Sequence, residues 1–126
     1  MRIGTFAILV LAVGLLPLSS PVFAHHGTAG YDMEKDTVVK GTITQFEWTN
    51  PHGQIHFDVA DSTAGAQAWI VECGPPSRLI EAGWTRHSLS VGDHVTLHIH
   101  GAKNGTPRGI LIKVVLENGQ TLENRA

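Results

Sequence analysis

Apolar and polar residues alternate along most of the chain after Thr37, and short clusters of turn-forming residues interrupt the alternation. A side-chain period of two is typical of a β-strand with one buried face. The pattern predicts five or six strands, over 37–48, 54–59, 68–73, 94–100, 109–117 and 120–122. A phase slip near Gln45 indicates a bulge or bend in the first strand. An all-β domain is therefore expected.

One short helix is expected between the third and fourth strands. Gly74-Pro75-Pro76 ends the third strand, Ser77 can cap a helix over 78–82, and Gly83 can end it. In an OB-type barrel a helix plugs the barrel at this point of the strand order. An immunoglobulin-like sandwich is the alternative, but it needs about seven strands and no helix. We predict an OB-like barrel over residues 37–126, preceded by an arm over residues 25–36.

Residues 1–24 have the pattern of a secretory signal peptide. A positive charge at Arg2 precedes an apolar run over 6–18, and the small residues Val22 and Ala24 mark a cleavage site. The apolar run is too short for a spanning helix. We therefore expect export to the periplasm and no membrane span after cleavage; an uncleaved N-terminal anchor is the alternative.

The composition narrows the function classes. A formal net charge of -2 argues against nucleic acid or an anionic membrane as the main partner. A single Cys excludes a disulfide framework within the chain. The sequence contains no nucleophile elbow, phosphate-binding loop, HExxH motif or recognisable catalytic pair of carboxylates. We therefore expect a binding protein rather than an enzyme, and the eight histidines are its most unusual feature.

Cleavage after Ala24 leaves His25 at the mature N-terminus. An N-terminal histidine offers an α-amine and an imidazole, so it can chelate a metal ion without a folded pocket. A further imidazole completes a T-shaped set of three nitrogens, which suits the tetragonal preference of Cu(II). The sequence predicts that His25, with His26 or His52, binds Cu(II) or another divalent transition metal for capture, buffering or delivery. Binding then weakens as pH falls through about 6, because the imidazoles must be neutral. The alternative is a polar tail that merely contains histidine.

A second function class is a metal-independent module that binds a small ligand, a glycan or an envelope protein. Trp48, Asn50 and His52 lie around the turn after the first strand, which OB folds commonly use for ligands. With Trp84 they would line a cleft, although a place in the core or at its edge is the favoured interpretation for Trp48, Trp69 and Trp84. A third interpretation is a scaffold domain with surplus surface histidines.

Further histidines lie on the fourth strand. His94, His98 and His100 share parity and therefore one face. His98 and His100 are about 6–7 Å apart along a strand, close enough to share a metal ion, but the polar face of an amphipathic strand is the favoured interpretation. Cys73 is expected to be buried, and the neighbouring Glu72 could orient a metal-binding histidine.

The chain resembles a family of short exported bacterial proteins, periplasmic in location, that is known only as a domain of unknown function. The resemblance rests on the N-terminal His25-His26, the Trp-x-Asn-Pro-His block at 48–52, and segments at 40–42, 82–86, 89–93 and 116–122. The positions that match within this pattern are His25, His26, Trp48, Asn50, His52 and Trp84. The stretch 72–76 departs from the pattern, so no role for Cys73 is implied. The resemblance implies the barrel and the compartment, but it brings no activity.

Overall fold

The computed structural model describes residues 27–61, 63 and 65–126. The expected signal peptide and the histidines at 25 and 26 lie outside the described residues. The strands and helices, in chain order, are η1 (Thr28–Gly30), β1 (Thr37–Glu47), β2 (Gly53–Asp61), β3 (Gly65–Cys73), α1 (Pro76–Glu81), β4 (His94–Gly101), β5 (Arg108–Leu116) and β6 (Thr121–Glu123). None of the helices in this part of the chain is long and apolar enough to cross a membrane.

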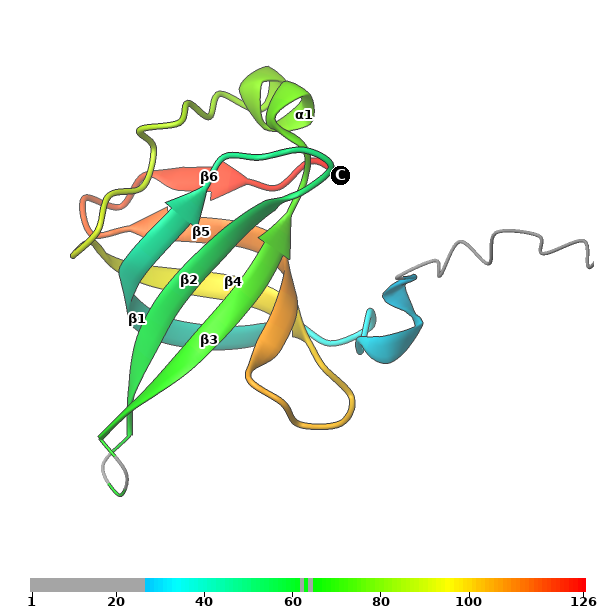
Figure 1. Ribbon diagram of the computed structural model, residues 1–126, viewed down its shortest axis with the longest axis vertical. Coiled ribbons are helices and arrows are strands. Elements are labelled where there is room, and N and C mark those ends of the chain that lie inside the picture. Colours follow the sequence, from blue (N-terminus) through cyan, green and yellow to red (C-terminus); the bar gives the residue numbers. More distant parts are fainter. Residues whose placement is uncertain (1–26, 62, 64) are drawn as a thin grey trace, which may run out of the picture.

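The strands form one sheet in the order β3-β2-β1-β4-β5-β6, which closes on itself through a pairing of β3 with β5. The closing pair is parallel and joins Ile70–Glu72 to Arg108–Ile110, whereas the other pairs are antiparallel. The result is a five-stranded closed barrel with β6 added at the edge of β5 (Figure 1). This confirms the OB-like barrel with a single short α-helix and excludes the open sandwich.

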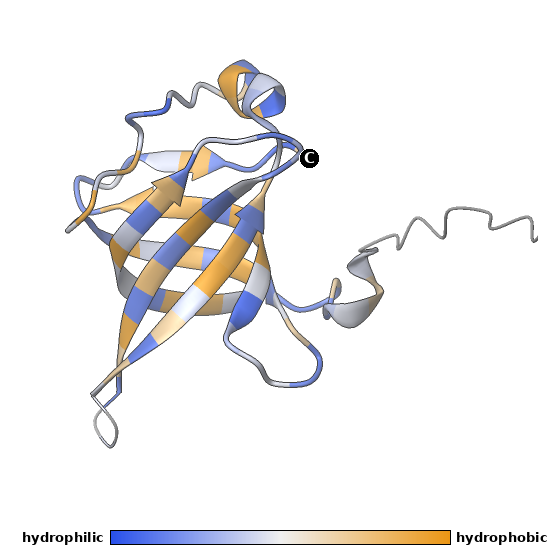
Figure 2. Ribbon diagram, viewed as in Figure 1, coloured by the Kyte–Doolittle hydropathy of each residue, from blue (hydrophilic) through white to orange (hydrophobic). Residues whose placement is uncertain are grey.

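The barrel interior is filled by every second residue of the strands, and Figure 2 shows the resulting alternation of hydrophilic and hydrophobic segments. Ile55 and Phe57 on β2, and Val95, Leu97 and Ile99 on β4, have 4% or less of their surface exposed. Burial of such side chains contributes roughly 1.5–3 kcal/mol each. The alternation therefore fixes which face of each strand is left for function.

Two irregularities bend the strands. The predicted bulge in β1 is present, because the register with β2 shifts between Ile43 and Gln45. A second bulge lies in β5, where Leu111 pairs with Ile99 but Lys113 pairs with His98, so one extra residue stands between them. The sequence did not indicate this second bulge, because β5 is apolar almost throughout and hides the change of phase.

The helix α1 starts two residues earlier than predicted. Pro75 is its N-cap residue and no side chain caps it, so the expected cap by Ser77 is wrong. Pro76 occupies the first helical position, which suits proline because the N–H that proline lacks would have no partner within the helix there. At the other end the predicted stop at Gly83 is confirmed, with φ of +90°. The Trp84 N–H donates to Leu79 O at 3.0 Å, the bond that defines a Schellman motif, and this turns Trp84 inward.

The arm before β1 packs along the end of β4. The Asp32 N–H donates to Gly101 O at 2.9 Å, and the Lys103 N–H donates to Gly30 O at 2.9 Å. Tyr31 forms an isolated bridge with Ala102. Figure 1 shows this segment beside the connection between β4 and β5. Residues 30–32 are thus held against the barrel by backbone hydrogen bonds.

Candidate functional site

His52 lies in the loop between β1 and β2, where its backbone carbonyl accepts a 3.2 Å hydrogen bond from Thr49 Oγ1. Its imidazole is exposed, and its Nδ1 lies 2.9 Å from Glu72 Oε1 on β3. The strand register explains the contact, because Gly53 pairs with Cys73 and Gln54 with Glu72, so Glu72 is the diagonal neighbour of His52 at the open end of this antiparallel pair. A histidine with one nitrogen on a carboxylate has the arrangement of many metal-binding histidines.

Glu72 also lines a cavity of about 550 Å³ between the arm and the barrel wall, here called the arm cavity. Gln54, Glu72 and Ile110 form one wall, as a row of neighbours across β2, β3 and β5. Gly27 and Tyr31 are among the arm residues that form the other wall. The arm cavity is therefore lined both by Gly27, which follows His26 in the chain, and by Glu72, whose carboxylate contacts His52.

The described residues do not complete a metal site by themselves. Within 27–61, 63 and 65–126, no group of three or more His, Cys, Asp or Glu side chains is placed to hold a metal ion. Of the three predicted metal ligands, only His52 is in this part of the chain. His25 and His26 lie outside the described residues.

The structure confirms the favoured core position of Trp84 and corrects its alternative place in a ligand cleft. Trp84 is 1% exposed, and its indole N–H donates to Glu123 O at 2.8 Å. It is a core residue, so it has almost no surface to offer a ligand. Trp48 is half-buried with its ring edge-to-face on Phe46 at 5.7 Å, and Asn50 is exposed in the loop. The structure therefore keeps Trp48, Asn50 and His52 together on one loop, whereas Trp84 packs in the core against Phe46.

The outer face of β4 carries its histidines as predicted, and each has a partner for Nδ1. His94 Nδ1 lies 3.0 Å from Thr42 Oγ1 on β1. His98 Nδ1 lies 2.9 Å and 3.1 Å from the two carboxylate oxygens of Asp36, and His100 Nδ1 lies 3.0 Å from Lys35 O. Sequence reasoning missed these partners, because they lie more than 50 positions away in the chain.

His56 forms a separate pair on the other side of β1. Its Nε2 lies 2.9 Å from Glu47 Oε1. Strand β1 lies between β2 and β4, so His56 and His98 are separated by a whole strand, as the OB order predicts. His56 therefore belongs to neither the arm cavity nor the β4 row.

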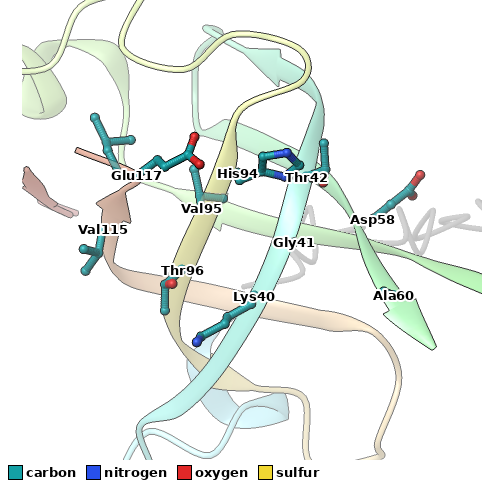
Figure 3. Close-up of a pocket in the computed structure, with 11 residues that line it drawn as sticks. Lys40, Gly41, Thr42, Asp58, Ala60, His94, Val95, Thr96, Val115 and Glu117 are labelled. Atoms are coloured by element: carbon teal, nitrogen blue, oxygen red, sulfur yellow. Dashed lines mark hydrogen bonds between the residues drawn. The ribbon is translucent and has the colours of Figure 1, made fainter. Parts of the chain in front are cut away.

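A further groove of about 370 Å³ crosses the outer face of β1 and β4. Figure 3 shows His94 beside Thr42, with Glu117 toward one end of the groove and Asp58 toward the other. Lys40 also lines it, so charges of both signs are present. The sequence did not indicate this groove, since its residues come from four strands whose order only the closed barrel establishes.

Cys73 is a buried free thiol, which confirms the favoured interpretation. Burial, with a smaller effect from the Glu72 carboxylate, raises the pKa of Cys73 to about 12. Because the thiolate is the reactive form, we expect the native protein to react with iodoacetamide at pH 8 at least 100-fold more slowly than the urea-unfolded protein. Mass spectrometry of timed samples would measure this. Equal rates would show that the thiol is accessible in the native state.

The fold and the site together define a class: a small OB-like barrel with a packed N-terminal arm and a His–Glu pair beside it. The model of a family of unknown function, DUF6152, matches residues 12–112, so the chain belongs to this family. The match confirms the resemblance to a domain-of-unknown-function family. No curated protein and no solved structure matches the chain. Its function must therefore be argued from the site.

Proposed function

We propose that this chain is a periplasmic binding protein, and not an enzyme, that holds Cu(II) or another divalent transition metal for capture, buffering or delivery. His25 contributes its α-amine and imidazole, and His52 or His26 completes the site. The observation that supports this most is the arm cavity, which is lined both by Gly27 and by Glu72, whose carboxylate contacts His52. The metal ion is the cargo, and a small ligand or an envelope protein partner is the alternative occupant.

The His52–Glu72 pair has chemistry that suits a metal ligand. Nδ1 lies against the Glu72 carboxylate, so Nε2 is the ring nitrogen whose lone pair would coordinate the metal ion. The carboxylate also restrains the ring orientation. The amine and imidazole of His25 then supply two nitrogens and His52 a third. Tyr31, which lines the same cavity, can offer an axial oxygen.

Covalent reach is consistent with this set of ligands. Consecutive Cα atoms are about 3.8 Å apart, so the Cα of His25 lies within about 7.6 Å of that of Gly27. An imidazole or an α-amine attached there can reach the arm cavity, because Gly27 already lines it. A loop of two residues also costs little entropy to order.

The experiment that tests the site is a competitive Cu(II) titration of the chain that begins at His25. We expect Glu72→Ala to weaken binding by about 10–100-fold, since the loss of such a carboxylate partner typically costs that much. His52→Ala should weaken binding at least as much. The double variant should be no weaker than His52→Ala alone, because Glu72 acts only through His52.

Glu47→Ala is the matched control, because Glu47 Oε1 lies at the same 2.9 Å distance from a histidine nitrogen, Nε2 of His56, but Glu47 does not line the arm cavity. It should leave the affinity unchanged. Copper affinity that survives both His25→Ala and His52→Ala would overturn the proposal. The metal-independent cleft has less support, because Trp84, one of its walls, is buried.

A further inference from the structure

Arg108 brings a positive charge to the wall of the arm cavity that also carries Glu72. It is the first residue of β5. The parallel pairing of β3 with β5 places Ile70 opposite Arg108 and Ile110 opposite Glu72, so the two charged residues are diagonal neighbours on one face of the sheet. Adjacent strands are about 4.8 Å apart and two residues rise about 6.6 Å, so their Cα atoms are about 8 Å apart. One wall of the cavity therefore presents a cation and an anion side by side.

These two charges do not neutralise each other. In the part of the chain that the structure describes, the Arg108 guanidinium forms no ion pair and no hydrogen bond with a protein group. On α1, by contrast, Arg78 pairs with Glu81 at 3.2 Å. The Glu72 carboxylate contacts His52 through Oε1 at 2.9 Å, which leaves Oε2 for a further partner. Both charged groups can therefore bond to a ligand in the arm cavity.

The opposite wall of the arm cavity leaves room for such a ligand. Residues 27, 29 and 30 of the arm are two glycines and an alanine, so their side chains do not fill the space. A methyl group added at Gly30 would meet no heavy atom within 4 Å beyond its chain neighbours. The volume of about 550 Å³ lies in the range of small-molecule sites, about 300–1,000 Å³. The cavity therefore has the size for a small organic molecule.

We propose that the arm cavity binds a small zwitterion with an α-ammonium and an α-carboxylate group, either a free amino acid or a short peptide. The carboxylate accepts hydrogen bonds from the Arg108 guanidinium, whose fork of N–H groups matches a carboxylate. The ammonium donates to Glu72 Oε2. An apolar side chain of the ligand packs on Ile110, and Tyr31 and Gln54 add a hydroxyl and an amide to the lining.

This inference goes beyond the proposed metal function, because it needs no metal ion and no residue before Gly27. It gives a chemical class to the small ligand that is the alternative occupant of the cavity. The pairing of charges selects a zwitterion over a simple ion. An anion alone would meet the Glu72 carboxylate, and a cation alone would meet Arg108. Attraction between unlike charges is also stronger in a partly enclosed cavity than in water, because the effective dielectric constant is lower.

An NMR titration of the chain that begins at His25, first freed of metal ions with a chelating resin, tests the ligand class. The probes are leucine and alanyl-leucine, which separate a free amino acid from a peptide. At least one of them should shift the amide signals of residues that line the arm cavity. Leucinamide lacks the carboxylate and N-acetyl-leucine lacks the ammonium. Each should bind about tenfold or more weaker than leucine, since a hydrogen bond to a charged group is worth at least that much.

Two variants assign each end of the ligand to its partner. Arg108→Gln should weaken binding of the zwitterion by about tenfold or more, but should not weaken binding of leucinamide, which has no carboxylate to lose. Glu72→Gln should weaken the zwitterion as much and should not weaken N-acetyl-leucine. Arg86→Gln and Glu47→Gln are the matched controls and should leave all affinities unchanged. Both remove the same charge, but Arg86 and Glu47 do not line the arm cavity.

Three results would overturn the proposal. The first is that neither leucine nor alanyl-leucine shifts the signals of the cavity residues at millimolar concentrations. The second is that N-acetyl-leucine or leucinamide binds as tightly as leucine, which would show recognition of one charge only. The third is unchanged zwitterion binding in Arg108→Gln or in Glu72→Gln. The protein carries no metal ion in this titration, so its outcome and that of the Cu(II) titration are independent, and failure of one proposal is distinguishable from failure of the other.

Discussion

Replacing Trp84 with alanine should lower the free energy of unfolding by about 3–5 kcal/mol, the usual cost of removing a buried aromatic side chain. Trp84 is among the largest fully buried side chains, and its ring lies 5.9 Å from that of Phe46. The indole N–H also reaches Glu123 O at 2.8 Å, which fixes the end of β6. The variant therefore loses apolar contacts, a hydrogen bond and an anchor for the C-terminal strand.

Urea denaturation followed by circular dichroism would measure this change. Trp48→Ala is the control, because Trp48 is half-buried at the rim of the core and should lose about half as much or less. Trp84→Phe should be intermediate, since it keeps most of the ring volume but gives up the bond to Glu123 O. Domains of this size are stable by about 5–15 kcal/mol, so Trp84→Ala can leave a large unfolded fraction. A loss below 1 kcal/mol would contradict the core role of Trp84.

The position of Trp84 shows what a sequence pattern leaves open. It follows Gly83 and precedes a polar stretch, so the pattern allows both the favoured core position and a place in a ligand cleft. The Schellman turn after α1 reverses the chain, and the indole joins the core cluster that also contains Leu79. That packing depends on the helix docking over the end of the barrel. A local sequence pattern cannot show how a helix packs against the rest of the fold.

The strand order was easier to predict, because apolar residues at every second position mark the inward face of most strands. Ile55 and Phe57 alternate with polar neighbours, and Asn118-Gly119 is a strong hairpin signal, confirmed by φ of +85° at Gly119. The three-strand, helix, two-strand order then leaves few topologies. The extra residue of the β5 bulge was not predicted, because apolar residues lie on both faces of this strand. Buried Leu111 and Val114 are consequently three positions apart rather than two.

The partners of the histidines were only partly foreseen. Glu72 was expected to orient a histidine, and the structure places it on His52, one position beyond the end of the shared hairpin pairing. The contacts of His98 and His100 with the arm were not foreseen, because they join residues more than 60 positions apart. Alternation shows that a side chain faces outward. It does not show which distant segment then covers it.

Placing one alanine before His25 should weaken Cu(II) binding by at least 100-fold relative to the chain that begins at His25, or about 2.7 kcal/mol. The addition converts the α-amine into an amide and moves the new amine to a residue without an imidazole. The amine and the imidazole of one residue bind as a chelate, in which the second ligand is already held near the metal. The change leaves every described side chain as it is, including the His52–Glu72 pair.

Two comparisons make this result specific to the amine. His25→Ala keeps an N-terminal amine but removes its imidazole, so it should lose affinity as the extended chain does, because either change breaks the chelate. His87→Ala, an exposed histidine on the connection between α1 and β4, should change nothing. Equal and weak binding by the extended and unextended chains would mean that the amine is not a ligand. In that case the loop that carries Trp48, Asn50 and His52 becomes the site to probe for a metal-independent ligand, because it keeps its exposed polar groups whatever precedes Gly27.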